Sequence, residues 1–352
     1  MKNTKTRLTL LVLALLVASS AGAYNTIGRW RTNQITMRAS SSSFPAGNAF
    51  RTSLGTVVSR FNQNPSNQSF AQIYDDTSVA LGNRQNEVWF STSSQYNPAV
   101  TYYWKDSSGY MVEADVIFYS AVAWTASMLK TDLITYGGSR RPFETTAMHE
   151  FGHAAGLKHE EGEYNIMGAD WNHIHLSGTT CRSYVGEDAN AGLVELYGLY
   201  AAGVREDLAV THFKYRGYSG EYSTHQPCGI FSAADALLLS STVSGQRRYT
   251  VARGSQARVE FTYENLGESG QAVNVGFYVS PDAVIATTDR LIATERLVLS
   301  RADVDTLRHA VTIPGDLVAG QTYHLGVIVD YDNRFIEVDA NNNAAHHVIL
   351  VQ

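Results

Sequence analysis

One run near the middle of the chain constrains its fold most. Residues 149–159 read His-Glu-Phe-Gly-His-Ala-Ala-Gly-Leu-Lys-His. On a helix, His149 and His153 stand one turn apart, so both imidazoles project from the same face. Gly156 can adopt a positive φ without a Cβ penalty, which allows the helix to end there and the chain to turn back. His159 would then return to the same place as a third imidazole.

Three histidines at this spacing predict a Zn²⁺ site. Zinc binds imidazole nitrogen at about 2.0–2.1 Å, and three protein ligands leave a fourth position for water, as in catalytic zinc sites. Glu150 is carried into the same cleft beside His149. We expect it to act as a general base that takes a proton from the water and passes it to a leaving amine. The alternative interpretation is a helix whose polar residues pack against a loop.

The zinc run, together with Asn165-Ile166-Met167-Gly168, resembles the metzincin signature, in which a zinc helix is followed by a turn that contains methionine. The resemblance implies that Met167 packs under the metal instead of binding it, since thioether is a poor ligand for Zn²⁺. It also implies a catalytic zinc and the hydrolysis of peptide bonds by metal-activated water.

The surrounding sequence resembles the matrixin branch of that group over about residues 28–200. Residues 101–104 and 112–118 are similar to the paired strands that precede the zinc helix in matrixin-like domains. Residues 188–198 are similar to their closing helix. The resemblance therefore implies an α/β (α+β) catalytic domain with a mixed twisted sheet above the zinc helix.

The hydrophobic pattern agrees with a sheet followed by helices in the first part of the chain. Residues 48–62 carry apolar side chains at helical spacing, which predicts one buried helix face. Residues 100–104 and 110–119 predict a hairpin around a turn at 106–109. Residues 100–104 would form either an edge strand that pairs with an extended peptide or an ordinary covered edge.

The pattern changes near residue 205, where helical periodicity disappears. Alternating strands are expected at residues 258–263, 271–279, 305–313, 323–330 and 345–351. Their spacing predicts an all-β sandwich. Asn265-Leu266-Gly267 and residues 339–343 resemble bacterial adhesion-type immunoglobulin-like domains. The expected organisation is a matrixin-like domain at 24–204 and an immunoglobulin-like accessory domain at 205–352.

The first 23 residues have the pattern of a signal peptide. A basic start precedes an apolar run at 8–17, and Ala21-Gly22-Ala23 has the small residues of a cleavage site. The alternative is a retained membrane anchor. Removal of the segment changes the net charge from −6 to −9, because it carries three basic and no acidic residues. We expect a secreted protein with no further membrane span and no nucleic-acid partner.

Five further residues each have two alternative interpretations. Tyr164, His173 and His175 would lie in a substrate pocket or donate to an oxyanion, or they would be ordinary residues of an exposed loop. Cys181 and Cys228 would form a disulfide or remain free thiols.

The matrixin resemblance implies a structural Ca²⁺ in the catalytic domain, although no loop in the sequence fixes its ligands. Separately, acidic residues near the C-terminus offer oxygen ligands that could gather round Ca²⁺. These residues are Asp330, Asp332, Asn333, Glu337 and Asp339. Their spacing does not match the familiar calcium loop, so the alternative is a solvated hairpin with acidic turns.

The sequence thus favours a secreted zinc endopeptidase that acts on protein or peptide substrates. One alternative is a non-catalytic binding or adhesion protein that uses the C-terminal sandwich. The other is a zinc hydrolase of non-peptide bonds. The sandwich would contact a cell surface or a polysaccharide.

Overall fold

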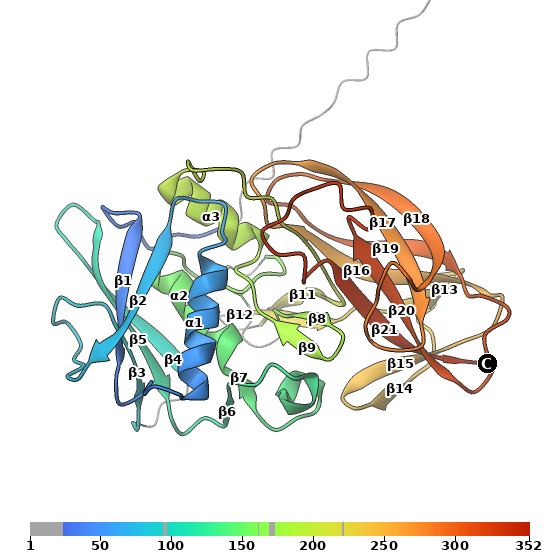
Figure 1. The fold of residues 1–352 in the computed structure, drawn as a ribbon, viewed down its shortest axis with the longest axis horizontal. Helices are drawn as coiled ribbons and strands as arrows, with labels where there is room; N and C mark the ends of the chain where they lie inside the picture. Colours follow the sequence, from blue (N-terminus) through green and yellow to red (C-terminus); the bar gives the residue numbers. More distant parts are fainter. Residues whose placement is uncertain (1–23, 94–96, 161, 169–172, 220–221) are drawn as a thin grey trace, which may run out of the picture.

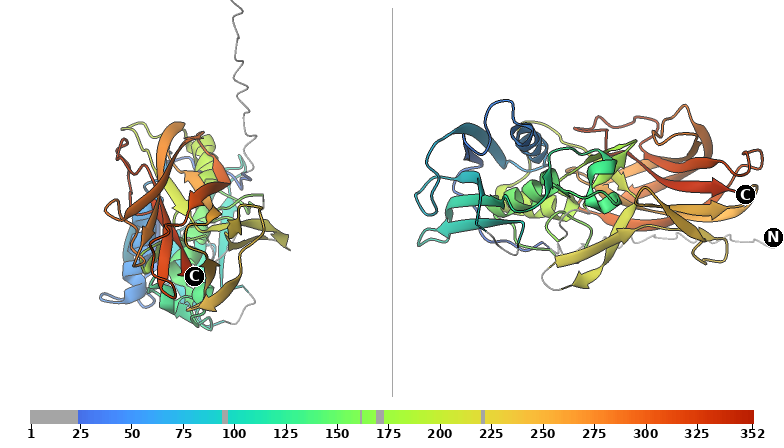
Figure 2. Two further views of the ribbon diagram at one scale, coloured as in Figure 1. Left: turned by 90° about the vertical axis from the view of Figure 1, so that its right-hand side faces the viewer. Right: turned by 90° about the horizontal axis from the view of Figure 1, so that it is seen from below.

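The computed structural model describes residues 24–352 except 94–96, 161, 169–172 and 220–221. The expected signal peptide therefore lies outside the described residues. The chain forms an N-terminal mixed α/β region with a largely parallel sheet, followed by a β-rich sandwich region (Figure 1). The two regions lie end to end along the longest axis of the molecule (Figure 2).

The α/β region is built on a five-stranded sheet with the order β2-β1-β3-β5-β4. Its strands are β1 (Gln34–Ser40), β2 (Ser69–Asp76), β3 (Glu87–Ser91), β4 (Ala99–Lys105) and β5 (Met111–Tyr119). The first four strands in this order are parallel, whereas β4 runs antiparallel to β5 as the predicted hairpin. Within the described part of the sheet, β4 pairs on one side only and forms an edge.

Two helices pack together against this sheet. In α1 (Ala49–Phe61), the side chain of Asn48 caps the first turn by accepting a hydrogen bond from the backbone of Phe50. The predicted apolar stripe of α1 is buried. In α2 (Phe143–Ala154), Phe143 lies within a group of aromatic rings that ties the helix to the sheet. α2 contacts β4 and β5, so its position is set by the edge of the sheet.

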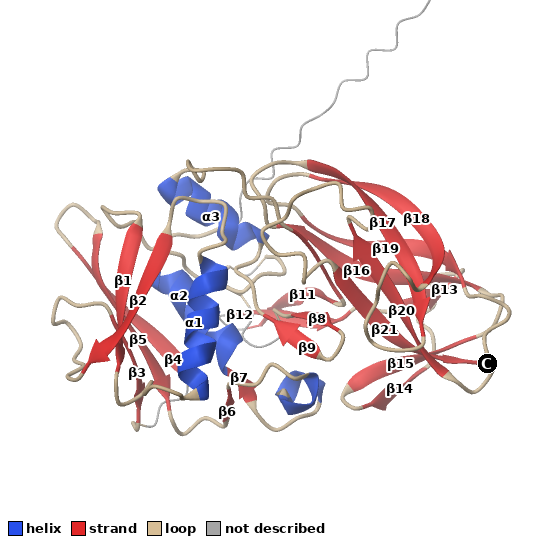
Figure 3. Cartoon of the chain, viewed as in Figure 1, coloured by secondary structure: helices blue, strands red, loops and turns tan. Residues whose placement is uncertain are grey.

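The region ends with α3 (Glu187–Tyr197). Tyr197 donates its hydroxyl to the carbonyl of Ala155, just beyond α2, at 2.7 Å. Among the described residues, the longer helices all belong to the α/β region (Figure 3). None of the helices described is both long enough and apolar enough to cross a membrane.

The sandwich region has two sheets around one apolar core. The smaller sheet contains β10 (Leu208–Thr211), β16 (Gln256–Asn265), β13 (Ile230–Ser232) and β19 (Val304–Thr312). The larger one has the order β14 (Ser240–Val243), β15 (Gln246–Val251), β21 (Ala344–Val351), β20 (Thr322–Val329), β17 (Gln271–Ser280) and β18 (Arg290–Leu299). Five of these strands lie where the sequence predicts them, whereas β13, β14, β15 and β18 were not predicted.

Several short elements lie outside the main sheets, and some of them form the junction between the two regions. They are β6 (Trp124–Thr125), η1 (Lys130–Asp132), η2 (Ile134–Tyr136), β7 (Arg141–Pro142), β8 (His175–Ser177), β9 (Thr180–Arg182), β11 (Phe213–Ser219) and β12 (Tyr222–Pro227). Apolar side chains from both sides form a separate buried cluster here, which includes Tyr136, Ile174 and Phe213. Thr211 donates to the carbonyl of Ile174 at 3.0 Å, inside this interface. The two regions therefore share buried surface.

Cys181 and Cys228 do not form a disulfide; both are buried free thiols. Cys181 lies in the apolar cluster at the interface, with Tyr136 among its members. The sulfur of Cys228 instead faces the hydroxyl of Thr262, at 3.8 Å. Each thiol therefore has its own packing environment, and the alternative of two free thiols is the one observed.

Candidate metal centre

The helix that carries the histidine run is a core helix. Pro142 precedes its first turn with a φ of −65°, which suits the start of a helix. Every residue of α2 is buried except His153, which is partly exposed. Tight packing on all sides fixes the direction in which His149 and His153 project.

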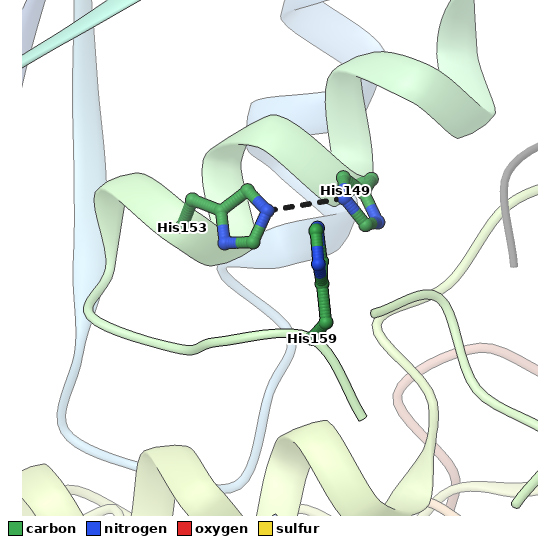
Figure 4. A group of neighbouring side chains, drawn as sticks. All are labelled: His149, His153 and His159. Atoms are coloured by element: carbon green, nitrogen blue, oxygen red, sulfur yellow. Dashed lines mark hydrogen bonds between the residues drawn. The ribbon is translucent and has the colours of Figure 1, made fainter. Parts of the chain in front are cut away.

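The three histidines of the run converge at one point. His149 and His153 extend from α2, and His159 approaches from the chain that follows the helix (Figure 4). The Nε2 atoms of His149 and His153 lie 3.1 Å apart. The ring of His159 is centred 5.2 Å from that of His149 and 4.8 Å from that of His153. One ring nitrogen from each of the three falls within 4.8 Å of the others.

Backbone carbonyls fix the tautomers of the first two histidines. Nδ1 of His149 lies 2.7 Å from the carbonyl oxygen of Ile166, and Nδ1 of His153 lies 2.8 Å from that of Leu157. A carbonyl oxygen only accepts, so each Nδ1 carries a proton and each Nε2 presents a lone pair. A carbonyl behind the ligating ring is the usual way in which proteins orient metal-binding histidine.

The imidazoles of His149 and His153 are neutral near pH 7. Burial lowers the pKa of His149 well below its usual value, and His153 and His159 lower it further. Burial lowers the pKa of His153 to about 4, and the neighbouring His159 contributes to this decrease. Two Nε2 lone pairs that face each other at 3.1 Å repel unless a cation lies between them. Two nitrogens bound tetrahedrally at about 2.05 Å to one Zn²⁺ would stand about 3.3 Å apart, so the donor set fits zinc.

Gly156 makes the return of the chain to His159 possible, as the sequence predicts. Its φ is +105°, and a Cβ there would lie 2.0 Å from the carbonyl oxygen of Gly28. Its own carbonyl accepts a hydrogen bond from the backbone of Ile27 at 2.7 Å. A larger residue would push the N-terminal segment away from the helix, which explains why glycine is required.

Met167 lies directly beneath α2 and is 1% exposed. A Cβ on Gly152 would meet its sulfur at 2.3 Å, so the methionine fills the space that this glycine leaves. The side chain of Asn165 holds the turn by accepting hydrogen bonds from the backbone of Met167 at 2.6 Å and of Gly168 at 3.1 Å. The turn also supplies the Ile166 carbonyl that orients His149.

Glu150 is buried beside the histidines and is held by the edge strand. The hydroxyl of Thr101, in β4, donates to Glu150 Oε2 at 2.6 Å. Burial raises the pKa of Glu150 to about 7, while the hydrogen bond from Thr101 and the charge of Arg141 oppose the increase. The carboxyl group is therefore suited to gaining and losing a proton near neutral pH.

A cavity of about 210 Å³ opens next to Glu150 and His149. Its walls come from the start of β4 and from the residues at and just before α2. Besides Glu150 and His149, the residues that line the cavity are Asn97, Pro98, Ala99, Arg141 and Thr146. Sequence analysis missed the parts played by Thr101 and Arg141, because the register of β4 against α2 depends on tertiary packing. The only indication in the sequence was that residues 100–104, which include Thr101, would form an edge strand.

Tyr164, His173 and His175 are buried, so the exposed loop considered as an alternative is wrong, whereas their part in a substrate pocket or as oxyanion donors stays a prediction. All three are at most 1% exposed, and none lines this cavity. His173 Nε2 and His175 Nε2 lie 3.3 and 2.7 Å from the two carboxylate oxygens of Glu264, in β16 of the sandwich. Tyr164 donates to the carbonyl of Ile174 at 3.1 Å. These residues therefore lie at the interface between the two regions and not in an exposed loop.

The acidic residues near the C-terminus are already bonded to protein donors. Asp330 accepts from the backbone of Arg334 and Phe335. Glu337 accepts from the backbone of Leu208 and from Asn343. Within the described chain, no three of these acids bring their oxygens to a common point. This arrangement favours the hairpin with acidic turns over the calcium site expected here.

Comparison with known proteins adds little. No family model and no curated protein matches the chain. Crystal and solution structures of the CARDB domain of a Pyrococcus furiosus protein, the former in complex with di-metal ions, resemble its C-terminal portion. Each is 18% identical and covers 42% of this chain and 90% or 95% of its own, with a TM-score of 0.26.

A β-glucosidase involved in saponin metabolism from intestinal bacteria also matches. It is 16% identical and covers 45% of this chain and 18% of its own, with a TM-score of 0.23. All of these overlaps are too weak to carry an argument about fold or function. The architecture described above therefore rests on the strand pairing of this chain alone.

Proposed function

We propose that this chain is an exported zinc-dependent endopeptidase with a metzincin-like catalytic domain and an immunoglobulin-like accessory sandwich. One observation carries the proposal. Three imidazoles converge, two of them with lone pairs directed by backbone carbonyls, and the buried Glu150 lines the same cavity as His149. His149, His153 and His159 would hold the ion. Zinc, when bound, would polarise a carbonyl group and lower the pKa of water from about 15.7 towards 7.

Glu150 would move the protons of the reaction. Its Oε2 is oriented by Thr101, so the carboxylate keeps one direction while it accepts a proton from water. Burial raises the pKa of Glu150 to about 7, which lets the same group return the proton to a leaving amine. A base that holds the proton too weakly or too tightly would slow one of the two transfers.

The edge of the sheet would bind the substrate. β4 pairs with β5 on one side, and Thr101 places this strand directly beside Glu150. An extended peptide could add to the free edge through main-chain hydrogen bonds, which do not depend on its sequence. One substrate side chain would then enter the cavity beside Arg141 and Thr146. This arrangement favours a peptide over other hydrolysable substrates.

The proposal is tested with the purified protein, loaded with zinc, on an unfolded casein-like substrate. We expect new amino termini in the products, detected by mass spectrometry, and loss of activity with a chelator. Glu150→Gln preserves size and should retain the metal while turnover falls by about 10²–10⁴-fold. Normal turnover in a zinc-loaded Glu150→Gln protein would refute the role of Glu150. Absence of new amino termini would instead favour a binding protein or a hydrolase of other bonds.

A further inference from the structure

A second group of possible ligands lies on the other side of the methionine turn. Glu163 lies two residues before Asn165 in the loop that carries the turn, and Glu187 and Asp188 lie in the first turn of α3. One carboxylate oxygen from each of the three falls within 4.8 Å of the others. Oxygens that bind one Ca²⁺ at about 2.4 Å can stand at most about 4.8 Å apart, so one ion can bridge all three.

Glu187 is the strongest indication that something is bound here. Its side chain is completely buried, and neither carboxylate oxygen meets a backbone or side-chain donor among the described residues, since the only group within hydrogen-bonding reach is another carboxyl group, that of Glu163. The charged groups that act on it are acidic, namely Asp188, Glu163 and Glu264. A carboxylate cannot donate a hydrogen bond to another carboxylate. A buried group in this position needs either a cation or a proton of its own.

The end of the helix does not supply enough positive charge. Acidic side chains in a first turn are favoured by the helix dipole, but its N-terminus amounts to only about half a unit charge. The residue before Glu187 is Gly186, which offers no side chain to the cluster. The helix end therefore offsets only part of the negative charge that three neighbouring carboxylates would carry.

We propose that Glu163, Glu187 and Asp188 bind one hard divalent cation, for which Ca²⁺ is the best fit. Carboxylate oxygens are the preferred ligands of Ca²⁺, whereas zinc favours nitrogen and sulfur. The ion would join the loop of Met167 to the first turn of α3, and water would complete its coordination. The site differs from the acidic turns near the C-terminus and does not depend on peptidase activity.

The test uses the full-length mature protein with Glu150→Gln as background, which prevents self-digestion. Calcium is removed by ion exchange in buffer that keeps ZnCl₂ constant, and CaCl₂ is then titrated by calorimetry. We expect one calcium bound per chain. At a concentration a hundredfold above the Kd, the Tm should rise by about 5 °C. MgCl₂ should have a smaller effect, because Mg²⁺ requires a tighter octahedral geometry and gives up water reluctantly.

Glu187→Gln should weaken calcium binding at least tenfold and abolish the calcium-dependent rise in Tm. Without calcium, this variant should melt above the parent, because a buried repulsion has been removed. Glu163→Gln, in the partly exposed loop, provides a second variant should the first fail to fold. Asp332→Asn, an exposed acid that accepts from Asn274, is the matched control and should respond to calcium as the parent does.

Two results would overturn the proposal. One is a parent protein that shows neither heat of binding nor a change of Tm with calcium, which would mean that a shared proton satisfies the cluster. The other is a Glu187→Gln protein that binds calcium as tightly as the parent. Neither result bears on the zinc site, because zinc is constant and hydrolysis is not measured.

Discussion

Two groups of histidines lie close in the sequence but differ in almost every physical respect. His149, His153 and His159 converge within the α/β region, beside a cavity. His173 and His175 are fully buried where that region meets the sandwich, and both face Glu264. Five of the eleven histidines fall between residues 149 and 175, so their density alone does not distinguish the two groups.

The two groups of histidines differ in which ring nitrogen bonds to the rest of the protein. In the first group, backbone carbonyls accept from Nδ1 of His149 and His153, and the Nε2 atoms of the two rings face each other at 3.1 Å, where the proposed metal would bind. In the second group, Nε2 itself faces a carboxylate oxygen and is already used. A histidine thus becomes a ligand or a structural link according to which nitrogen the protein occupies. The predictions below test this contrast.

The largest effect should come from the ligands themselves. His153→Ala removes one of three imidazoles, so the zinc affinity should fall by more than about 100-fold, beyond the loss typical of outer contacts. His175→Ala should leave the zinc affinity unchanged, because that ring is committed to Glu264. Competition with a chromophoric chelator measures both values. Equal loss of zinc in the two folded variants would eliminate the proposed contrast.

Glu264→Gln should have the next largest effect, and it should be on stability. The variant loses the charge and one acceptor oxygen, which leaves a buried imidazole without its partner. We expect the free energy of unfolding to fall by about 2–4 kcal/mol, measured with urea. Asp316→Asn, which breaks an exposed pair with Arg290, serves as control and should have a much smaller effect on the free energy of unfolding. A Glu264→Gln protein as stable as the parent would contradict a structural role.

The same carboxylate predicts how stability depends on pH. Burial raises the pKa of Glu264, but His173 and His175 outweigh burial and hold it at about 2, below the ordinary 4.5. The stabilisation is therefore complete above about pH 4.5 and is lost as the pH falls from there towards 2. Urea midpoints measured across this window should fall more steeply for the parent than for Glu264→Gln. Parallel curves would show that another group is responsible.

Much of the α/β region and of the candidate metal centre could be predicted from the sequence, because the signals there are local. Two histidines four residues apart share a face on any helix, so the convergence of His149 and His153 follows from α2 alone. A glycine after a helix indicates a tight turn, and at Gly156 a Cβ would indeed clash. Thr101 and Glu264 could not be found this way. Each acts on a residue far along the chain, and the register that brings them together depends on how sheets and helices pack.

Thr101→Val should have a moderate effect on the proposed reaction. It removes the hydrogen bond that lowers the pKa of Glu150, so the acid limb of the pH–rate profile should move to higher pH. We expect a several-fold loss of kcat/KM at pH 7 that diminishes as the pH rises. Thr101→Ser should restore the profile, since it keeps the hydroxyl. An unchanged acid limb in Thr101→Val would show that Glu150 does not control it.

The smallest effect concerns the two cysteines. A disulfide between Cys181 and Cys228 would stabilise the protein by about 4 kcal/mol through the loop that it closes, and a reductant would then lower the Tm by several degrees. Both thiols are instead free and buried, and burial raises the pKa of Cys181 to about 12. We therefore expect reductant to leave the Tm unchanged. Alkylating reagent should modify both thiols only after unfolding, because neither is exposed or ionised in the folded state. A reductant-dependent Tm would mean that the two thiols pair in solution, and the packing around each would have to change to let them meet.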